Sequence, residues 1–296
     1  MRIALVLLSW GIQLVPTHGA AQTPTTPYTP EQCPSCAGWN AERPAFPVFG
    51  NTYWVGTRGL GAVLVTSESG HILLDGGLPE SAPLILENIR ALGFALEDVH
   101  AIVNSHAHYD HAGGIAALQE ATGAMVYAMP LAAEALRTGV LTEGDPQVES
   151  ALPYPPVAEV TVIADGDTVR AGGAAVVAHL TPGHAPGDTS WSWVSCEDGL
   201  CHSMVYADSQ TPVSDNGFLF SEGDRRTRFE AGLDRIAALS CDILMTPHPG
   251  ASGLWDRFEA RERGDAAGLV DPDGCVRYAE RYRDALRRRL ELEGIE

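Results

Sequence analysis

The segment His106-Ala107-His108-Tyr109-Asp110-His111 carries four side chains that can bind metal ions. Two histidines two residues apart on a loop can both face one ion. Asp110 and His111 are adjacent and point in different directions from that pair, so a second ion can bind beside the first. Zinc suits imidazole and carboxylate ligands. Because few other arrangements place so many ligands in one short loop, the spacing predicts a hydrolase site with two zinc ions.

Each of the two ions would still lack a third protein ligand, and two further histidines are suitable. His184 follows an apolar stretch and lies in the Gly- and Pro-rich segment 181–188, and His248 comes directly after an apolar run that ends at Met245. Both are therefore expected at the ends of buried strands, near the metal loop. The histidines that lack a ligand partner nearby in sequence are interpreted as structural or surface residues: His71, His100, His179 and His202.

The residues around the metal loop predict a strand over 101–105 and a helix that ends at about Thr122. A loop between a buried strand and a helix is where α/β proteins commonly place their chemistry. Each half of the chain runs from several strands into strand–helix units. We predict a single α/β domain in which two such halves pack sheet to sheet with helices outside, as a four-layer αβ/βα sandwich.

Hydrophobic patterning predicts the remaining elements. Strands are expected over 53–55, 62–66, 71–74, 125–128, 160–163, 174–180, 189–194, 204–207 and 242–245. Helices are expected over about 81–92, 131–137 and 226–239, and at the C-terminus, where the buried face would comprise Ala279, Tyr282, Leu286 and Leu290. The segment 138–157 is expected to be irregular, and a long loop in a compact domain is often functional.

The composition limits the classes of partner. The chain has 296 residues, 45% of them hydrophobic, which is enough for a full core. Its formal net charge is −19, whereas nucleic-acid binders usually carry a basic face and anionic membrane surfaces attract basic segments. We therefore expect no nucleic-acid partner and no attachment to a membrane surface.

The N-terminus has the plan of a secretory signal peptide over 1–21. Arg2 precedes a short apolar run over 3–14, and small residues end at Ala20 and Ala21, where cleavage is expected. The run is too short to span a bilayer, so no membrane anchor is expected after cleavage. An extended, Pro-rich leader is expected over 22–49, followed by the catalytic domain over 50–296. The mature protein would be periplasmic or secreted.

The chain has six cysteines, and an even number in an exported protein suggests disulfide bonds. Cys196 and Cys201 flank a turn between two strand-like runs, so a bridge across a hairpin is expected. Cys241 and Cys275 can join the last strand to the last helix. The Cys-Pro-Ser-Cys segment at 33–36 lies in the leader, not at the start of a helix after a strand, so redox catalysis is not expected. The cysteines also lack the paired spacing of zinc fingers.

With these features, the sequence resembles the metallo-β-lactamase superfamily across essentially the whole mature chain. The H-x-H-x-D-H loop alone is typical of the superfamily, which also includes thioesterases, lactonases and nucleases. Further motifs resemble the exported, disulfide-containing enzymes of subclass B3. These are Tyr-Trp-Val-Gly-Thr at 53–57, Gly-His-Ile-Leu at 70–73, Ala-Leu-Gly-Phe at 91–94, Asp-Pro-Gln at 145–147, Tyr-Ala-Asp-Ser at 206–209 and Thr-Pro-His-Pro at 246–249.

The resemblance implies two sets of ligands. The first zinc ion would be bound by His106, His108 and His184, and the second by Asp110, His111 and His248. Other subclasses place a cysteine on the second metal, but the corresponding segment 207–211 has none, as in subclass B3.

The disulfides depart from some relatives, which pair a leader cysteine with one just after the Val-Gly-Thr segment. Arg58 stands at that position here, and the leader has a second cysteine instead. The resemblance therefore implies that Cys33 can pair with Cys36.

The implied activity is zinc-dependent hydrolysis of the β-lactam amide bond of small-molecule antibiotics, and hence antibiotic resistance. A zinc-bound hydroxide would attack the lactam carbonyl, because zinc lowers the pKa of bound water from about 15.7 toward 7. Asp110 would orient the hydroxide. By resemblance, Ser209 and Thr211 are candidates to bind the substrate carboxylate, and Gln147 can contact substrate from the irregular loop. A monomer is expected.

The alternatives differ in what they require of the same residues. Another hydrolase of the superfamily, such as a lactonase or thioesterase, often uses an aspartate to bridge two metals, and Asp208 is the candidate. A di-iron redox protein would usually have glutamate in place of His108. A non-enzymatic zinc-binding protein should have lost ligands, whereas this chain keeps all six. Asp75, directly after its strand, is interpreted as a structural turn residue.

Overall fold

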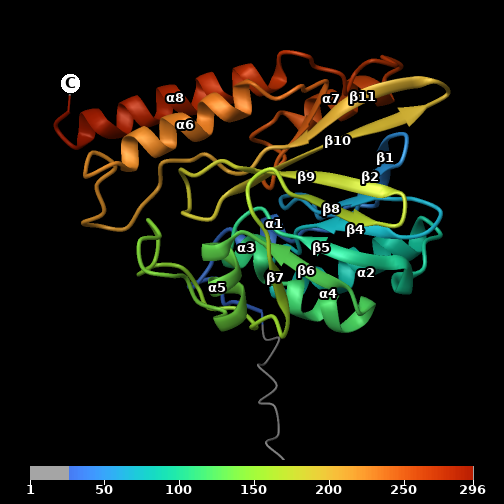
Figure 1. Ribbon diagram of the computed structural model, residues 1–296, viewed down its shortest axis with the longest axis horizontal. Helices are drawn as coiled ribbons and strands as arrows, with labels where there is room; N and C mark the ends of the chain where they lie inside the picture. The colour runs from blue at the N-terminus through green and yellow to red at the C-terminus, as the bar shows by residue number, and fades with distance from the viewer. Residues whose placement is uncertain (1–26, 296) are drawn as a thin grey trace, which may run out of the picture.

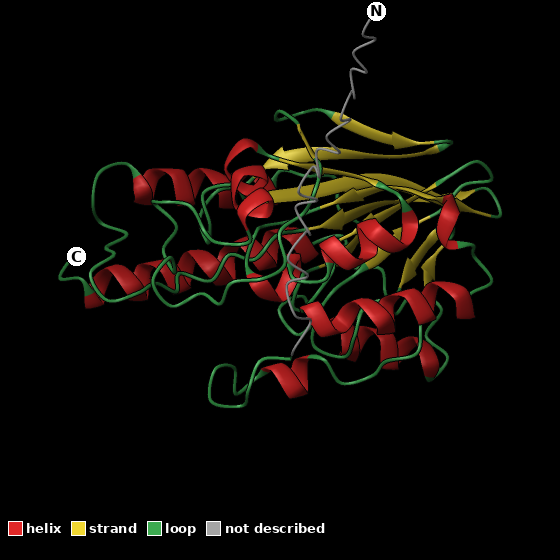
Figure 2. Cartoon of the chain, turned by 90° about the horizontal axis from the view of Figure 1, so that it is seen from below, coloured by secondary structure: helices red, strands yellow, loops and turns green. Residues whose placement is uncertain are grey.

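The computed structural model describes residues 27–295, which form one α/β domain with four layers (Figure 1). Two β-sheets pack face to face at the centre, and helices cover the outer face of each sheet. The predicted αβ/βα sandwich is therefore confirmed. Figure 2, at right angles to this view, shows that the strands occupy one side of the molecule and that the C-terminal end extends beyond them. The expected signal peptide lies outside the described residues.

The first sheet contains seven strands in the order of the sequence. The first four are antiparallel: β1 (Phe46–Phe49), β2 (Thr52–Trp54), β3 (Val63–Val65) and β4 (His71–Leu74). The next three run parallel to β4: β5 (Val99–Val103), β6 (Met125–Ala128) and β7 (Val160–Val162).

Parallel strands need crossover connections, which are usually helices. The connections here contain α2 (Ala82–Ala91), α4 (Ile115–Thr122) and α5 (Pro130–Thr138). Their buried residues join the apolar cluster on the outer face of the first sheet. Ile85 and Ile89 of α2 are buried as the helical pattern predicts, and Gly93 follows the helix with a φ of 88°. A short turn of helix, η1 (Pro79–Ser81), precedes α2, and another, η2 (Leu96–Asp98), follows it.

The second sheet has five strands in the order β12-β11-β10-β9-β8. Four are antiparallel: β8 (Thr168–Ala171), β9 (Ala174–Leu180), β10 (Thr189–Glu197) and β11 (Leu200–Tyr206). The fifth, β12 (Ile243–Met245), runs parallel to β11. Each sheet therefore has parallel strands at one edge, β5 to β7 in the first and β11 and β12 in the second. Loops that follow the carboxyl ends of these strands can meet at a common site.

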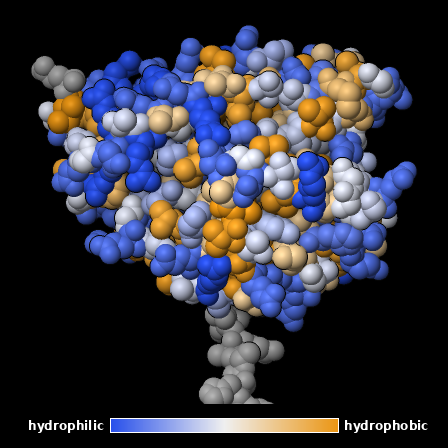
Figure 3. Space-filling view, viewed as in Figure 1, coloured by the Kyte–Doolittle hydropathy of each residue, from blue (hydrophilic) through white to orange (hydrophobic). Residues whose placement is uncertain are grey.

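Helices α6 (Arg225–Ala237) and α8 (Gly274–Leu292) cover the outer face of the second sheet. The predicted buried face of the last helix is confirmed, because Ala279, Tyr282, Leu286 and Leu290 all lie in this cluster. The opposite face of the helix is charged and forms surface ion pairs such as Arg287 with Asp284. In Figure 3, hydrophilic side chains accordingly gather over α6 and α8.

The core between the sheets is built from residues that alternate along the strands. Trp54 of the first sheet and Trp191 and Tyr206 of the second are among the largest fully buried side chains, and they belong to one cluster. Burial of aromatic side chains of this size contributes strongly to the stability of a core. The two sheets are therefore held face to face mainly by apolar contact.

The leader differs from the expected extended segment. It contains a short helix, α1 (Cys36–Trp39), and the edge strand β1, which begins before residue 50. Pro47 lies within β1, and a proline is tolerated in an edge strand because one side of such a strand needs no partner. The first sheet thus starts within the leader.

Three more elements were not expected from the sequence. These are β8, the single-turn helix α3 (Tyr109–Ala112) inside the metal loop, and α7 (Leu254–Glu262). The first two have only four residues each, which is too short for a period to be recognised. Helix α7 presents few apolar residues, and Leu254 is the one fully buried within it.

All three expected disulfide pairings are present: Cys33–Cys36, Cys196–Cys201 and Cys241–Cys275. The second links two residues directly opposite each other in the β10–β11 hairpin. The third ties the chain just before β12 to α8. Among the residues described, no helix is both long and apolar enough to cross a bilayer.

Candidate metal centre

The expected ligands come from loops that follow three strands in two different sheets. His106 and His108 follow β5, and Asp110 and His111 lie in the first turn of α3. His184 lies between β9 and β10, and His248 follows β12. The fold therefore brings segments more than 140 positions apart to one edge of the sandwich.

Asp75 fixes the start of the metal loop. Its carboxylate accepts hydrogen bonds from the backbone N–H of Ser105 at 2.7 Å, the Ser105 hydroxyl at 2.6 Å and the Tyr206 hydroxyl at 2.9 Å. Burial raises the pKa of Asp75 to about 7, and the hydrogen bonds from Ser105 oppose this shift. Asp75 belongs to none of the candidate ligand groups. Its hydrogen bonds to Ser105 and Tyr206 instead give it a structural role, as a link between the end of β4 and the second sheet.

The three histidines expected at the first zinc ion meet in a compact group. Their ring centroids are 4.6 Å apart for His106 and His108, 4.8 Å for His108 and His184, and 4.9 Å for His106 and His184. One nitrogen from each ring lies within 4.8 Å of the other two. Nε2 of His106 is buried and has no hydrogen-bond partner among the described residues. An unpaired nitrogen facing two other rings fits a metal ligand.

A second polar group holds the opposite nitrogen of each of these rings. Asp208 Oδ1 lies 2.7 Å from Nδ1 of His106, and the Asp145 carboxylate lies 3.1 Å from Nε2 of His108. The Thr211 carbonyl accepts a hydrogen bond from Nδ1 of His184 at 2.9 Å. Such partners fix the tautomer and orientation of metal-binding histidines. Among residues 27–295, no hydrogen bond is formed by the remaining ring nitrogens, Nε2 of His106, Nδ1 of His108 and Nε2 of His184.

Asp110 lies close to the two remaining expected ligands, His111 and His248. Its Oδ2 lies 3.3 Å from Nε2 of His111 and 3.2 Å from Nε2 of His248. The rings of His106 and His111 have centroids 4.5 Å apart, so this second group adjoins the first. Burial alone would raise the pKa of Asp110, but His111 and His248 hold it well below its usual range. Asp110 is therefore an ionised carboxylate, as a zinc ligand must be.

The pKa directions of His106 and His184 also suit metal binding. Burial, reinforced by the neighbouring histidines, holds the pKa of His106 and of His184 well below the usual range of an imidazole. Burial opposes charge on His108 as well, although the hydrogen bond to Asp145 raises the pKa of that ring. Neutral imidazoles and an ionised carboxylate are the donor set that zinc prefers. The donors of this centre thus fit zinc.

A pair of buried acids lies behind His106. Burial, followed by the charge of Asp208, raises the pKa of Asp188 well above its usual range. Asp188 is therefore protonated and donates to Asp208, whose own pKa burial raises to about 6. His106, Asp188 and Asp208 could themselves form a cluster of metal ligands by proximity. Because Asp208 binds the Nδ1 edge of His106, away from the free Nε2, we interpret the acid pair as support for His106.

The three candidate substrate-binding residues lie in different surroundings. The Thr211 hydroxyl is 3.0 Å from Nδ1 of His184, so it contacts a ligand ring. Ser209 is buried, and its backbone N–H donates to Asp208. Nε2 of Gln147 has no partner among the described residues, which leaves this amide free to donate. The roles of all three in substrate binding remain predictions.

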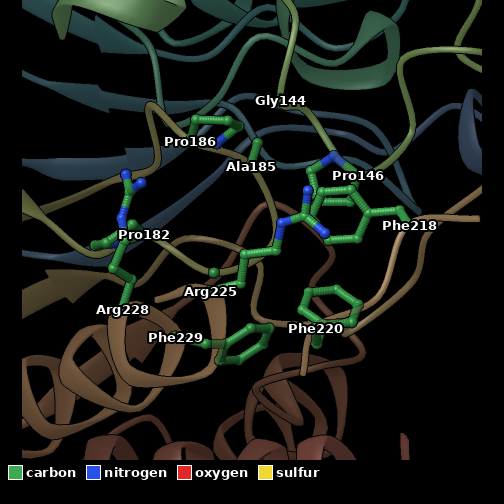
Figure 4. A pocket seen from close by; sticks show the side chains of 11 residues that line it. Gly144, Pro146, Pro182, Ala185, Pro186, Phe218, Phe220, Arg225, Arg228 and Phe229 are labelled. Carbon is green, nitrogen blue, oxygen red and sulfur yellow. The ribbon is translucent and has the colours of Figure 1, made fainter. Parts of the chain in front are cut away.

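A small apolar pocket of about 50 Å³ adjoins the His184 loop (Figure 4). It lies between that loop, the segment around Pro146, and the start of α6. The pocket is lined chiefly by Phe218, Phe220 and Phe229, and the Arg225 guanidinium stacks 4.0 Å from the centre of the Phe218 ring. A Cβ atom on Gly183 would lie 3.0 Å from Phe229. A glycine beside His184 thus lets the loop pack closely on α6.

Sequence reasoning missed two residues that support the ligands. Asp145 was noted only as part of a motif, although an acid between glycine and proline in a long loop is a weak signal for such a role. Asp188 ends the Gly- and Pro-rich His184 segment and was assigned no function. Both are buried acids, and burial of an acid cannot be read from local sequence.

Comparisons with known proteins agree with this geometry. Residues 61–248 match the family model of the metallo-beta-lactamase superfamily. The structure is similar to the Rm3 metallo-beta-lactamase, with 47% identity and a TM-score of 0.86 over 88% of this chain and 99% of that one. It is also similar to MEM-A1, a subclass B3 metallo-beta-lactamase from a soil metagenome library, with 45% identity and a TM-score of 0.85 over 86% and 98% of the two chains.

A further similar structure is MIM-1 from Novosphingobium pentaromativorans, with 42% identity and a TM-score of 0.81 over 89% of this chain and 97% of that one. These similarities extend over nearly the whole of each relative, so they include both halves of the metal centre. The chain therefore belongs to the metallo-β-lactamase superfamily, and within it resembles the subclass B3 metallo-β-lactamases.

Proposed function

We propose that this enzyme hydrolyses the amide bond of β-lactam antibiotics with two zinc ions. The first ion is assigned to His106, His108 and His184, and the second to Asp110, His111 and His248. The observation that carries the proposal is the convergence of these six side chains at one edge of the sandwich, in a chain similar to subclass B3 enzymes.

Zinc in such a site lowers the pKa of a water molecule toward about 7 and polarises a carbonyl oxygen, which are the two requirements for amide hydrolysis at neutral pH. The protein side chains then serve to orient the reactants. Asp110 remains ionised and accepts a hydrogen bond from the attacking water, which directs it toward the lactam carbonyl. The unpaired amide of Gln147 and the hydroxyl of Ser209 are assigned to the polar groups of the substrate.

The position of Asp208 favours a β-lactamase over the lactonase or thioesterase alternative. In that alternative, an aspartate bridges the two metals. Here Asp208 binds Nδ1 of His106 at 2.7 Å, on the side of the ring opposite the free nitrogen, so it is poorly placed to bridge. Asp208 therefore orients the expected ligand His106, whereas the alternative requires Asp208 to bind the metals itself.

We further propose that the enzyme is exported and acts as a monomer in the periplasm or outside the cell. The signal-like residues 1–21 and the three disulfide bonds support this location, because disulfides persist mainly in oxidising compartments. Residues 22–49 would form the leader and 50–296 the catalytic domain, and β1, at the end of the leader, pairs with β2 of the first sheet.

The test is hydrolysis of a panel of penicillins, cephalosporins and carbapenems by the purified enzyme, with and without a chelator. We expect chelator-sensitive hydrolysis that zinc restores. His184→Ala and His248→Ala should each lower kcat/KM by at least about 100-fold, because each removes a ligand. His100→Ala, at an exposed histidine remote from the loop, is the matched control and should retain full activity. Opening of a lactone without hydrolysis of any β-lactam would contradict the proposal.

A further inference from the structure

The two halves of the metal centre are secured in different ways. Each histidine of the first half has a hydrogen-bond partner on its outer nitrogen, supplied by Asp208, Asp145 or Thr211. In the second half, Nδ1 of His111 has no partner among the described residues. Nδ1 of His248 has a longer contact of 3.3 Å to the Gly59 carbonyl. Hydrogen bonds therefore orient the second half less firmly, and packing must contribute more to its geometry.

That packing comes from the leader segment, by which we mean residues 28–43. Tyr109 lies between His108 and Asp110, and its ring meets the Tyr28 ring edge-on with centroids 5.4 Å apart. The Tyr109 hydroxyl is 3.7 Å from Sγ of Cys33. Figure 1 draws α1 of the leader beside α3 of the metal loop. The leader thus covers the residue directly before the carboxylate ligand.

The leader also covers His248 through Trp39. The two rings have centroids 5.1 Å apart. The Trp39 carbonyl accepts a hydrogen bond from the Gly59 N–H at 3.0 Å, and the Gly59 carbonyl is the group that faces His248. A Cβ atom on Gly59 would lie 2.6 Å from Cα of Trp39. Trp39, Gly59 and His248 therefore form one closely packed unit.

The leader segment is itself firmly attached. The Cys33–Cys36 disulfide is buried, with both cysteines 3% exposed. The Tyr28 hydroxyl donates to the Pro153 carbonyl in the irregular loop at 2.8 Å. At the other end, the Arg43 guanidinium lies 4.5 Å from the ring centre of Phe258 in α7. The leader is thus anchored on both sides of the residues that it covers.

From these contacts we infer that Tyr28 and Trp39 are positioning residues for the second zinc ion. By packing on Tyr109 and His248, they hold the ligands of the second ion. The ligands of the first ion are instead held by the hydrogen bonds from Asp208, Asp145 and Thr211. The inference rests on the proposed two-zinc function. It also explains the Cys33–Cys36 bridge, which fixes α1 against the metal loop.

The test is the zinc affinity of the intact enzyme, measured by competition with a chromophoric chelator that resolves two binding steps. In Trp39→Ala, the dissociation constant of the second ion should rise about tenfold, and that of the first should change by less than about twofold. Trp39→Phe keeps an aromatic ring and should recover most of the affinity. The matched control is Phe94→Ala, a half-buried ring at the other end of the first sheet that contacts Tyr53 and His71.

Reference variants assign the two steps: His184→Ala should abolish the first and His248→Ala the second. Circular dichroism with a thermal melt checks that Trp39→Ala is folded, and Tyr28→Ala provides an independent substitution on the other side of the leader. Equal weakening of both steps, or unchanged affinity in both leader variants, would overturn the inference. A parent enzyme that binds a single zinc ion would instead contradict the two-zinc function on which the inference depends.

Discussion

The carboxylate of Asp208, just after β11, lies 2.7 Å from Nδ1 of His106, which follows β5 in the other sheet. Both side chains are fully buried. The contact turns the free Nε2 of His106 toward the other ligands. A residue of the second sheet therefore sets the orientation of a ligand from the first, and the metal centre depends on the correct packing of the two sheets.

We expect Asp208→Ala to weaken binding of the first zinc ion by about 10- to 100-fold, because loss of such a partner frees the ring to rotate. Asp208→Asn retains an acceptor for Nδ1 and should lose less. Zinc competition titrations measure both. The control is Asp242→Ala, which removes the acid from a histidine–aspartate pair with His202, 3.6 Å apart and remote from the centre. An Asp208→Ala enzyme with parental zinc affinity would show that this contact does not orient the ligand.

Asp145 gives a corresponding prediction for the irregular loop. It contacts Nε2 of His108 and accepts a hydrogen bond from the backbone N–H of Gln147 at 2.8 Å. Asp145→Ala should therefore lower both the affinity for the first zinc ion, by about tenfold or more, and kcat/KM at saturating zinc. Glu143→Ala, at an exposed acid two residues away, should change neither. Normal values for Asp145→Ala would show that Asp145 does not support His108.

The protonated acid Asp188 predicts a dependence of stability on pH. Burial raises the pKa of Asp188 in the folded protein well above its value in the unfolded chain. The contribution of Asp188 to the free energy of unfolding is therefore fully present below about pH 4 and is lost as the pH rises through the folded pKa. Asp188→Asn cannot lose this proton and keeps a donor toward Asp208. As the pH rises, the free energy of unfolding of Asp188→Asn should therefore increase relative to that of the parent, by at most about 1.4 kcal/mol per pH unit.

Denaturant unfolding at pH 5, 7 and 9 measures this difference for Asp188. Asp188→Ala, which also loses the hydrogen bond from the Ala185 N–H at 2.7 Å, should be less stable than the parent at acidic pH. A constant difference between parent and Asp188→Asn across this range would mean that Asp188 is already ionised in the folded enzyme.

The link between Asp75 and Tyr206 predicts a cost to stability. Asp75→Ala leaves the N–H and hydroxyl of Ser105 and the hydroxyl of Tyr206 without their acceptor, and should lower the free energy of unfolding by about 3 kcal/mol. Tyr206→Phe removes one donor and should cost about 1 kcal/mol. Tyr282→Phe is the control, since that hydroxyl has no hydrogen bond among the described residues. A stable Asp75→Ala protein would contradict the role of Asp75 as a link between the sheets.

The sequence alone predicted the ligand chemistry of the centre and the order of most of the elements. The H-x-H-x-D-H spacing predicted four candidate ligands within one loop, and the apolar runs before His184 and His248 placed both at strand ends. Strands such as 71–74, 125–128 and 174–180 were predicted with the bounds that the structure shows. These features are local, because ligand type, hydrophobic period and turn residues are properties of neighbouring positions.

Only the tertiary structure decided what supports each ligand. The partners of His106, His108 and His248 come from positions 102, 37 and 189 residues away along the chain, and no local pattern specifies such pairs. The leader is a further case: its sequence shows no sustained period, yet Trp39 packs on His248, an expected metal ligand, and β1 forms the edge of a sheet. Burial and hydrogen bonding between distant segments arise only when the two sheets pack together, so the support of this site is a property of the fold.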